Sequence, residues 1–384
     1  MKVLCIGSSN IEITCPLDSS IVEDSVIKLS EKYECGGGNA GNIAYLFGKW
    51  GVETYIASMV GADDLASKIK KEYETIGVRT DFIETSYDKG TSQSIVIINK
   101  VNKSKTVLDI PNNSFLKKYA FNIEPDLIIS DGNDHNASLA AFDKYPKIPS
   151  FLTITNVSNE VLELGKYVQY IILNRGAAET ITNGKVNYDD SNTIVNIYNS
   201  LKQRFSKAEI IMTLGERGCV YSINGQVKIM PALKVEVVDT NGAGSVFVGA
   251  FAYAMGRSFG LEKSIAYATI ASSLSTTKIT GRMSIPTLTE VSNYYDGKFG
   301  TQNNPNNQVA QVNNASEVNM QTNMNTNVSD VKISTTSVEQ PVDSLNANND
   351  LQINASIDNS MAFNSENTNM QVPDSDNNVD AQNA

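Results

Sequence analysis

A glycine-rich turn at residues 239–245, Asp-Thr-Asn-Gly-Ala-Gly-Ser, is the segment of this sequence best suited to holding an anion. The apolar run 246–255 follows directly and predicts a helix that begins at the turn. Glycine lets a ligand approach the backbone, and the free N–H groups of a first helical turn, aided by the helix dipole, favour negative charge. A plain strand-to-helix turn with Ser245 as N-cap is the alternative. The spacing indicates a phosphate site at Gly242, Ala243 and Gly244.

Two further turns combine glycine with polar side chains. Residues 35–44, Cys-Gly-Gly-Gly-Asn-Ala-Gly-Asn-Ile-Ala, lead into a predicted helix, and Asn39 and Asn42 can each donate and accept hydrogen bonds. Residues 213–218, Thr-Leu-Gly-Glu-Arg-Gly, follow a predicted buried strand. Close packing of a helix on the sheet would account for the first turn equally well, and an ordinary reverse turn would account for the second.

The histidine and cysteine content restricts the chemistry that the chain can perform. His135 is the single histidine, so a Ser-His-Asp triad, a Cys-His pair or a multi-histidine metal site would depend on that residue alone. The four cysteines lie far apart without a Cys-x-x-Cys pair, which is typical of a reduced cytoplasmic protein. The apolar run 3–6 is too short for a signal peptide, and no apolar run is long enough to span a membrane.

Composition divides the chain near residue 300. Residues 301–384 hold 21 Asn and 8 Gln, no glycine and one aromatic residue. Ten acidic residues and one lysine give this segment −9 of the total charge of −11, which leaves the first 300 residues at −2. The sequence therefore predicts a folded unit at 1–300 and a disordered Asn/Gln-rich acidic tail at 301–384 that either acts as a spacer or binds a protein partner. The acidic balance argues against nucleic-acid or membrane binding.

Alternating strand and helix patterns predict a mostly parallel sheet with helices on both faces. Residues 25–34 alternate apolar and polar side chains, and 92–110 predict a hairpin, so about 12–35 and 88–110 are expected to form a small β lid. Strands are expected at 3–7, 54–59, 127–130, 150–154, 170–173 and 210–214, and helices at 39–49, 66–76, 193–205, 245–255 and 261–277.

The three turns occur in an order that resembles the ribokinase-like (PfkB) carbohydrate kinase family. Residues 37–44, Gly-Gly-x-x-x-Asn-x-Ala, resemble the family's N-terminal signature, and 239–244, Asp-Thr-x-Gly-Ala-Gly, resemble its C-terminal signature. Thr213-x-Gly215-x-x-Gly218 resembles the turn on the nucleotide side. The similarity spans about residues 1–296, with shorter matches at Gly61-x-Asp63, Gly77-Val78, Gly281 and Ile285-Pro286-Thr287.

The resemblance implies a three-layer α/β core with a β lid, and transfer of the γ-phosphoryl of ATP, with Mg²⁺, to a hydroxymethyl group of a sugar, nucleoside or similar acceptor. By motif, the acceptor would bind near Asn10, Glu12, Gly37, Gly38 and Asn42 beneath the lid. The anion hole would be Gly242, Ala243 and Gly244, and nucleotide contacts would come from Thr213, Gly215, Gly218, Asn174 and the helix 261–277.

Three acidic positions depart from the family pattern. Ser245 stands where the family has the Asp that accepts the acceptor's proton, and losing a general base typically costs about 10²–10⁴-fold in rate. Glu12, one methylene longer, replaces an Asp that holds acceptor hydroxyls. The family's Asn-x-x-Glu, linked to the Mg²⁺–phosphate region, becomes Asn174-x-x-Ala177, so a metal-linked acid would have to be Glu179.

Two functions remain open. One is an ATP-dependent kinase that uses another acid as its base, with Asp239 as the nearest candidate and Asp131 or Asp134 behind it. Asp239 is better suited to ordering the loop or the metal–water shell than to acting as the base. The other is a pseudokinase that binds nucleotide or sugar and acts through a partner. The alternating apolar residues of the lid additionally indicate a homodimer face.

Overall fold

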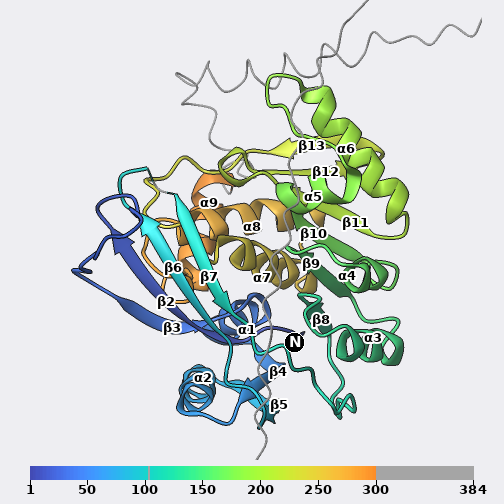
Figure 1. The fold of residues 1–384 in the computed structure, drawn as a ribbon. Helices are drawn as coiled ribbons and strands as arrows, with labels where there is room; N and C mark the ends of the chain where they lie inside the picture. Colours follow the sequence, from blue (N-terminus) through green and yellow to red (C-terminus); the bar gives the residue numbers. More distant parts are fainter. Residues whose placement is uncertain (103, 300–384) are drawn as a thin grey trace, which may run out of the picture. The chain divides into compact units, whose positions relative to one another are not determined.

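A nine-stranded sheet runs through the centre of the fold in the order β13-β12-β11-β10-β9-β8-β1-β4-β5 (Figure 1). The computed structural model describes residues 1–102 and 104–299. Neighbouring strands from β5 to β11 are parallel, and only β12 and β13 join antiparallel. The strands are β1 (Lys2–Ile6), β4 (Glu53–Gly61), β5 (Val78–Ser86), β8 (Leu127–Ser130), β9 (Ser150–Ile154), β10 (Tyr170–Asn174), β11 (Glu209–Thr213), β12 (Cys219–Ile223) and β13 (Gln226–Met230).

Helices cover both faces of this sheet, which confirms the predicted three-layer α/β core. In β1, Val3 and Cys5 pack into one hydrophobic cluster, and Leu4 and Ile6 pack into another on the opposite face. The first cluster includes α1 (Asn39–Lys49), α2 (Asp64–Thr75), α7 (Ala243–Gly256), α8 (Leu261–Ser275) and α9 (Leu288–Phe299). The second includes α3 (His135–Lys144), α4 (Asn159–Leu164), α5 (Arg175–Thr182) and α6 (Ser191–Arg204).

A second sheet of four strands, in the order β3-β2-β6-β7, forms the predicted lid (Figure 1). The β2–β6 pair is parallel, whereas β2–β3 and β6–β7 are antiparallel. The predicted hairpin is confirmed by β6 and β7, although position 103 of its turn lies outside the described residues. The strands are β2 (Asn10–Leu17), β3 (Tyr33–Gly37), β6 (Gln93–Asn99) and β7 (Lys105–Ile110).

The predicted lid strand at 25–34 is wrong in its position. Residues 18–32 form no strand, and β3 begins only at Tyr33. The alternating apolar side chains find no sheet face to pack on, and Val26 is 91% exposed. Alternation predicts a strand only where a neighbouring strand is available, and here the pairing with β2 starts at Tyr33.

The order of the strands reverses at β1, which lies between β4 and β8. Crevices at the carboxyl ends of parallel strands, at such a reversal, are the usual ligand sites of open α/β sheets. The segments that follow β1 and β8 meet α1 here, since Asp131 accepts hydrogen bonds from the backbone N–H groups of Ser8 and Ala40. We therefore expect the ligand site to lie near the N-terminal ends of α1 and α7.

The remaining expectations concern membranes and the tail. No helix within residues 1–102 and 104–299 is long and apolar enough to cross a membrane. The predicted disordered tail, 301–384, lies outside the described residues.

Candidate functional site

The predicted anion hole lies at the N-terminus of α7, as the sequence indicates. Gly242 is the N-cap residue, with φ of 78°, and it supplies no side-chain hydrogen bond to the helix. A Cβ at Gly242 would also lie 3.0 Å from the Gly281 Cα, so glycine is required for conformation and for space. A Cβ at Gly244 would have no atom within 4 Å. The Ala243 N–H donates a long hydrogen bond to Thr240 O at 3.4 Å, and no side chain caps the first turn of α7, so an anion could bind at this helix end.

Asp239 holds the shape of this turn. Its side chain is 4% exposed, and its two oxygens accept hydrogen bonds from the backbone N–H groups of Asn241 at 2.8 Å and Thr280 at 2.9 Å. Both carboxylate oxygens are therefore committed to the backbone. This geometry suits the loop-ordering role that the sequence left open for Asp239.

Ser245 lies on the buried side of the same helical turn. Its Oγ donates a hydrogen bond to Asn39 Oδ1 at 3.0 Å, and Asn39 Nδ2 donates to Thr155 Oγ1 at 3.1 Å. The hydroxyl is thus connected to an amide rather than to an acid or an imidazole. This environment does not activate Ser245 as a base.

The start of β2 lines the predicted acceptor side. Asn10 Nδ2 donates to Ser94 Oγ at 2.7 Å, but among the described residues the buried Asn10 Oδ1 has no hydrogen-bond partner. A Cβ at Gly37 would lie 2.4 Å from this oxygen, so only glycine leaves room for it. A buried carbonyl oxygen without a partner is costly, and a ligand hydroxyl would satisfy it.

Glu12 is a buried carboxyl group, 7% exposed, at the interface between lid and core. Its Oε1 accepts a hydrogen bond from Asn241 Nδ2 at 2.5 Å, and Lys105 Nζ of β7 donates to Asn241 Oδ1 at 3.3 Å. Burial raises the pKa of Glu12, Asp239 raises it further, and Lys105 opposes both effects. The lid and the α7 turn are therefore connected through Asn241.

Arg282 is a residue of this site that the sequence analysis missed. It is 1% exposed, and its guanidinium donates to Gly37 O at 3.0 Å, Asn42 Oδ1 at 3.2 Å, Tyr73 OH at 2.7 Å and Glu72 Oε2 at 3.1 Å. It thereby fixes two predicted acceptor residues, Gly37 and Asn42. No local sequence pattern marks Arg282, and only the structure shows that Gly36 makes room for it, since a Cβ at Gly36 would lie 1.9 Å from Arg282 Nη1.

The two other aspartates considered as bases also have structural roles. Asp131 Oδ2 accepts from Ser8 Oγ and from the Ser8 and Ala40 N–H groups, and its Oδ1 accepts from the Asn133 N–H. Asp134 caps α3 and accepts from the backbone N–H of Leu116 at 2.7 Å. Burial raises the pKa of Asp134, but both of its oxygens are already engaged.

The predicted nucleotide residues lie at the carboxyl ends of β10 and β11. Asn174 and Thr213 are paired neighbours in the two strands, and Asn174 Oδ1 caps α5 through the Ala177 N–H at 2.8 Å. Gly215 is exposed at the start of a short 3₁₀ turn. Gly218, in contrast, has φ of 93°, and a Cβ there would lie 1.9 Å from Met230 O. Backbone packing against β13 therefore accounts for the glycine at 218.

The candidate metal-linked acid, Glu179, faces the loop after α5. Its carboxylate accepts from the Val186 N–H at 3.1 Å and pairs with Lys185 at 3.0 Å, and these contacts lower its pKa. Within the part of the chain that the structure describes, no three His, Cys, Asp or Glu side chains are grouped to hold a metal ion.

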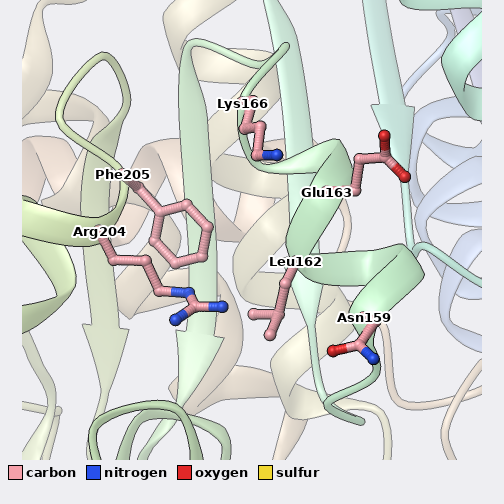
Figure 2. A pocket seen from close by; sticks show the side chains of 6 residues that line it. All are labelled: Asn159, Leu162, Glu163, Lys166, Arg204 and Phe205. Carbon is pink, nitrogen blue, oxygen red and sulfur yellow. The ribbon is translucent and has the colours of Figure 1, made fainter.

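Two surface pockets lie over the helices of the second hydrophobic cluster. His135 lines one of about 370 Å³, and its Nε2 lies 3.1 Å from Glu163 Oε2, an exposed pair. Figure 2 shows the other, of about 190 Å³, where Leu162 and Lys166 lie beside Arg204 and Phe205 and the Glu163 side chain points away from them. Neither pocket contains a predicted acceptor or anion-hole residue.

Known proteins with similar sequence and fold cover most of this chain. The model of the pfkB family carbohydrate kinases matches residues 1–288. A ribokinase from Staphylococcus aureus (strain COL) is 24% identical over 310 residues, covering 76% of this chain and 98% of the relative. Ribokinase from Cryptococcus neoformans var. grubii serotype A, solved in complex with ADP, has a TM-score of 0.63 at 21% identity and covers 76% of this chain and 99% of its own. Arabidopsis thaliana ribokinase complexed with ribose and ATP has a TM-score of 0.62 at 18% identity, covering 76% and 97%.

Proposed function

Because the chain belongs to the pfkB family of carbohydrate kinases, we propose that it transfers the γ-phosphoryl group of ATP to a hydroxymethyl group of a small sugar or nucleoside. One observation carries this proposal: two groups that need a ligand lie on either side of the start of α1. One is the first turn of α7, which has no side-chain cap and whose Ser245 donates a hydrogen bond to Asn39. The other is the unpartnered Asn10 Oδ1, which lies against Gly37.

The donor side follows from the α7 turn. The N–H groups of Ala243 and Gly244 would stabilise the negative charge on the equatorial oxygens of the transferring phosphoryl group. Asp239 keeps these groups aimed, because it holds Asn241 and Thr280 in place. Thr213, Gly215 and Asn174 would contact the nucleotide, and the relatives solved with ADP and with ATP support a nucleotide-binding role for this chain.

The acceptor side follows from β2 and α1. Asn10 Oδ1 would accept a hydrogen bond from one acceptor hydroxyl, and Asn42, held by Arg282, would bind another. A hydroxymethyl group placed between Asn10 and the α7 turn would be oriented toward the phosphoryl group, and such positioning supplies much of the rate of phosphoryl transfer.

Mg²⁺, when bound, would neutralise the phosphate charge that develops during transfer. Proteins commonly hold Mg²⁺ through one or two carboxylates together with substrate phosphates and water. The oxygens of Asp239 are bonded to backbone N–H groups, and Glu179 is paired with Lys185. We therefore assign the ion to the nucleotide phosphates and water, with no protein cage.

A pseudokinase that binds nucleotide and acts through a partner is the second candidate, and the observation that favours it is Ser245. The two candidates differ in turnover, and the Ser245→Asp variant separates them. We expect measurable transfer to D-ribose, another pentose, a hexose or a nucleoside by the natural chain, and an increase in kcat of up to about 10²-fold in the variant.

Nucleotide binding is common to both candidates and needs its own measurement. ATP–Mg²⁺ at about 100 times its Kd should stabilise the protein by about 2.7 kcal/mol, which is a rise of several degrees in Tm. An unchanged Tm at millimolar ATP in a well-folded sample would contradict both candidates. Binding without turnover in the natural chain would leave the pseudokinase.

A further inference from the structure

In the candidate site, one oxygen of the Glu12 carboxylate accepts no hydrogen bond from the described residues. Among the described residues, the Asn241 amide is the only group that donates a hydrogen bond to Glu12, and it does so to Oε1. Oε2 lies toward Gly37, since a Cβ at Gly37 would lie 3.3 Å from it. Gly37 is also the residue that adjoins Asn10 Oδ1, where the acceptor is expected.

Glu12 contacts the turn that leads into α7, because its Oε1 accepts a hydrogen bond from Asn241 Nδ2 at 2.5 Å. Glu12 Oε1 and Asn42 Nδ2 lie 3.4 Å and 3.7 Å from the same point, where a Cβ at Gly281 would be. Ser245 contacts Asn39, and residues three apart on a helix have Cβ atoms about 5–6 Å apart. Glu12 thus lies near Asn42, and Ser245 contacts Asn39, both in the first turn of α1.

Three other buried acids, those weighed as bases in the sequence, are already bonded to the backbone. Both oxygens of Asp239, Asp131 and Asp134 accept hydrogen bonds from backbone N–H groups. Protonating any one of them would break contacts that hold a turn or a helix end. Of these buried acids, only Glu12 keeps a free oxygen on the acceptor side.

We propose that Glu12 is the general base of phosphoryl transfer in this chain, in place of the missing acid at position 245. The role rests on the proposed kinase function. The acceptor hydroxyl oxygen forms a bond to the γ-phosphorus as the bond from that phosphorus to the β-phosphate oxygen breaks, and ADP leaves. The hydroxyl proton passes to Glu12 Oε2 and is later released to solvent. The extra methylene of Glu12, relative to the Asp of the family motif, lengthens its reach toward the reacting hydroxyl.

The electrostatic surroundings of Glu12 suit a base. Burial raises the pKa of Glu12 from its usual value, which makes its carboxylate a stronger base. The charged and titratable groups that face it are Lys105 of β7 and Arg282, which lower the pKa, Asp239 of the α7 turn, which raises it, and Cys35 of β3. The Cys35 thiol stays neutral, because burial and Glu12 raise its pKa to about 11. A base works in its ionised form, so kcat should rise with pH through the raised pKa of Glu12.

The test compares Glu12→Gln with the full natural chain, using ATP–Mg²⁺ and the acceptor of highest turnover among D-ribose, other pentoses, hexoses and nucleosides. Calorimetry gives the ATP Kd independently of transfer. We expect kcat to fall by about 10²–10⁴-fold, the rising limb of the pH profile to disappear, and the ATP Kd to stay nearly constant. Glu12→Asp should keep the limb. Glu34→Gln, which removes an ion pair with Lys68 at 2.7 Å on the same lid sheet, is the matched control and should keep natural turnover.

A double variant separates proton transfer from acceptor binding. Glu12→Gln combined with Ser245→Asp should recover at least about tenfold of the lost kcat, because a carboxylate is restored at the other side of the α1 turn. If Glu12→Gln raises only the acceptor KM and keeps kcat and the pH limb, the base role is wrong while the kinase function stands. If the natural chain binds ATP but phosphorylates no acceptor, both the kinase function and the base role are wrong.

Discussion

Buried charge at the residue scale is concentrated where the lid meets the core. The side chains of Glu12, Asp239 and Arg282 are each less than a tenth exposed. Glu12 and Asp239 both contact Asn241, just before α7, and Arg282 contacts Asn42 of α1. Burying charge without partners is costly, so such a cluster persists only where hydrogen bonds compensate it. The Arg282 guanidinium donates four such hydrogen bonds.

Substitution of Arg282 should therefore lower the stability of the fold. Arg282→Ala leaves Gly37 O, Tyr73 OH and the Glu72 carboxylate without their donor, and we expect a loss of about 3–5 kcal/mol in the free energy of unfolding. Urea denaturation measures this loss. Arg79→Ala is the matched control, because Arg79 pairs with Asp81 at the surface and its removal should barely shift the midpoint. Equal midpoints for the two variants would refute the structural role of Arg282.

The residue scale also shows what the sequence could predict. The motif residues Gly37, Asn42 and Gly242 could be placed, because their glycine-rich turns stand directly before apolar helical runs, a pattern that is local in the chain. Arg282 could not be placed, because nothing in the sequence distinguishes a buried guanidinium from a solvated one. Its partners come from separate segments of the chain, which only the folded structure brings together.

At the element scale, the N-terminus of α7 is the part of the site with a clear physical function. Its first turn has no acidic residue and no side-chain cap, in contrast to α2, α3 and α6, which Asp63, Asp134 and Asp190 cap. Glycine in place of a capping side chain forgoes roughly a few tenths of a kcal/mol. An anion that binds there would recover this stabilisation.

An acid added at the N-terminus of α7 should preserve the stability of the fold and weaken the binding of ATP. Gly244→Asp has open space for its side chain and a favourable helix dipole, so the fold should keep its stability or gain about 0.3–1 kcal/mol. The same charge should repel phosphate, and the Tm increase caused by ATP–Mg²⁺ should disappear. Asn192→Asp adds an acid to the first turn of α6 and serves as control, with the ATP effect retained. A full ATP effect in Gly244→Asp would show that nucleotide binds elsewhere.

Elements buried on both sides could be predicted best. The strands β1, β8, β9 and β10 and the helices α1, α7 and α8 follow their sequence patterns closely, since continuous apolar runs have one plausible environment. The segments β5, β12, β13, α3, α4, α5 and α9 were not predicted. Many of their side chains are only partly buried, and tertiary contacts rather than local pattern determine them. The exposed outer strand β7, with Val107, Leu108 and Ile110, keeps the proposed homodimer face as a prediction.

At the scale of the whole molecule, the family match covers residues 1–288, and the described fold covers nearly all of 1–299. Most of the net negative charge belongs to residues 301–384. Ending the chain after Gly300 should leave Tm within about 2 °C of the natural value, because the removed segment has few large apolar side chains to contribute to a core. Differential scanning calorimetry measures it. A decrease of many degrees would show that the segment stabilises the folded unit.

The first 300 residues carry a net charge of −2, so their overall electrostatic repulsion of an anionic substrate is weak. The proposed ATP substrate would therefore meet a nearly neutral domain, and local groups would determine where it binds. The central claim is that the natural chain is a working kinase although Ser245 occupies the position of the expected acid.

The most direct measurement follows the γ-phosphoryl group itself. The natural full-length chain is incubated with γ-³²P-labelled ATP, Mg²⁺ and D-ribose, other pentoses, hexoses or nucleosides, and the label in each acceptor is quantified against time. Catalysis predicts labelled acceptor that forms in proportion to enzyme, and the Glu12→Gln variant should reduce its rate by about 10²–10⁴-fold. Label that stays in ATP with every acceptor, in protein that binds ATP, would contradict the claim.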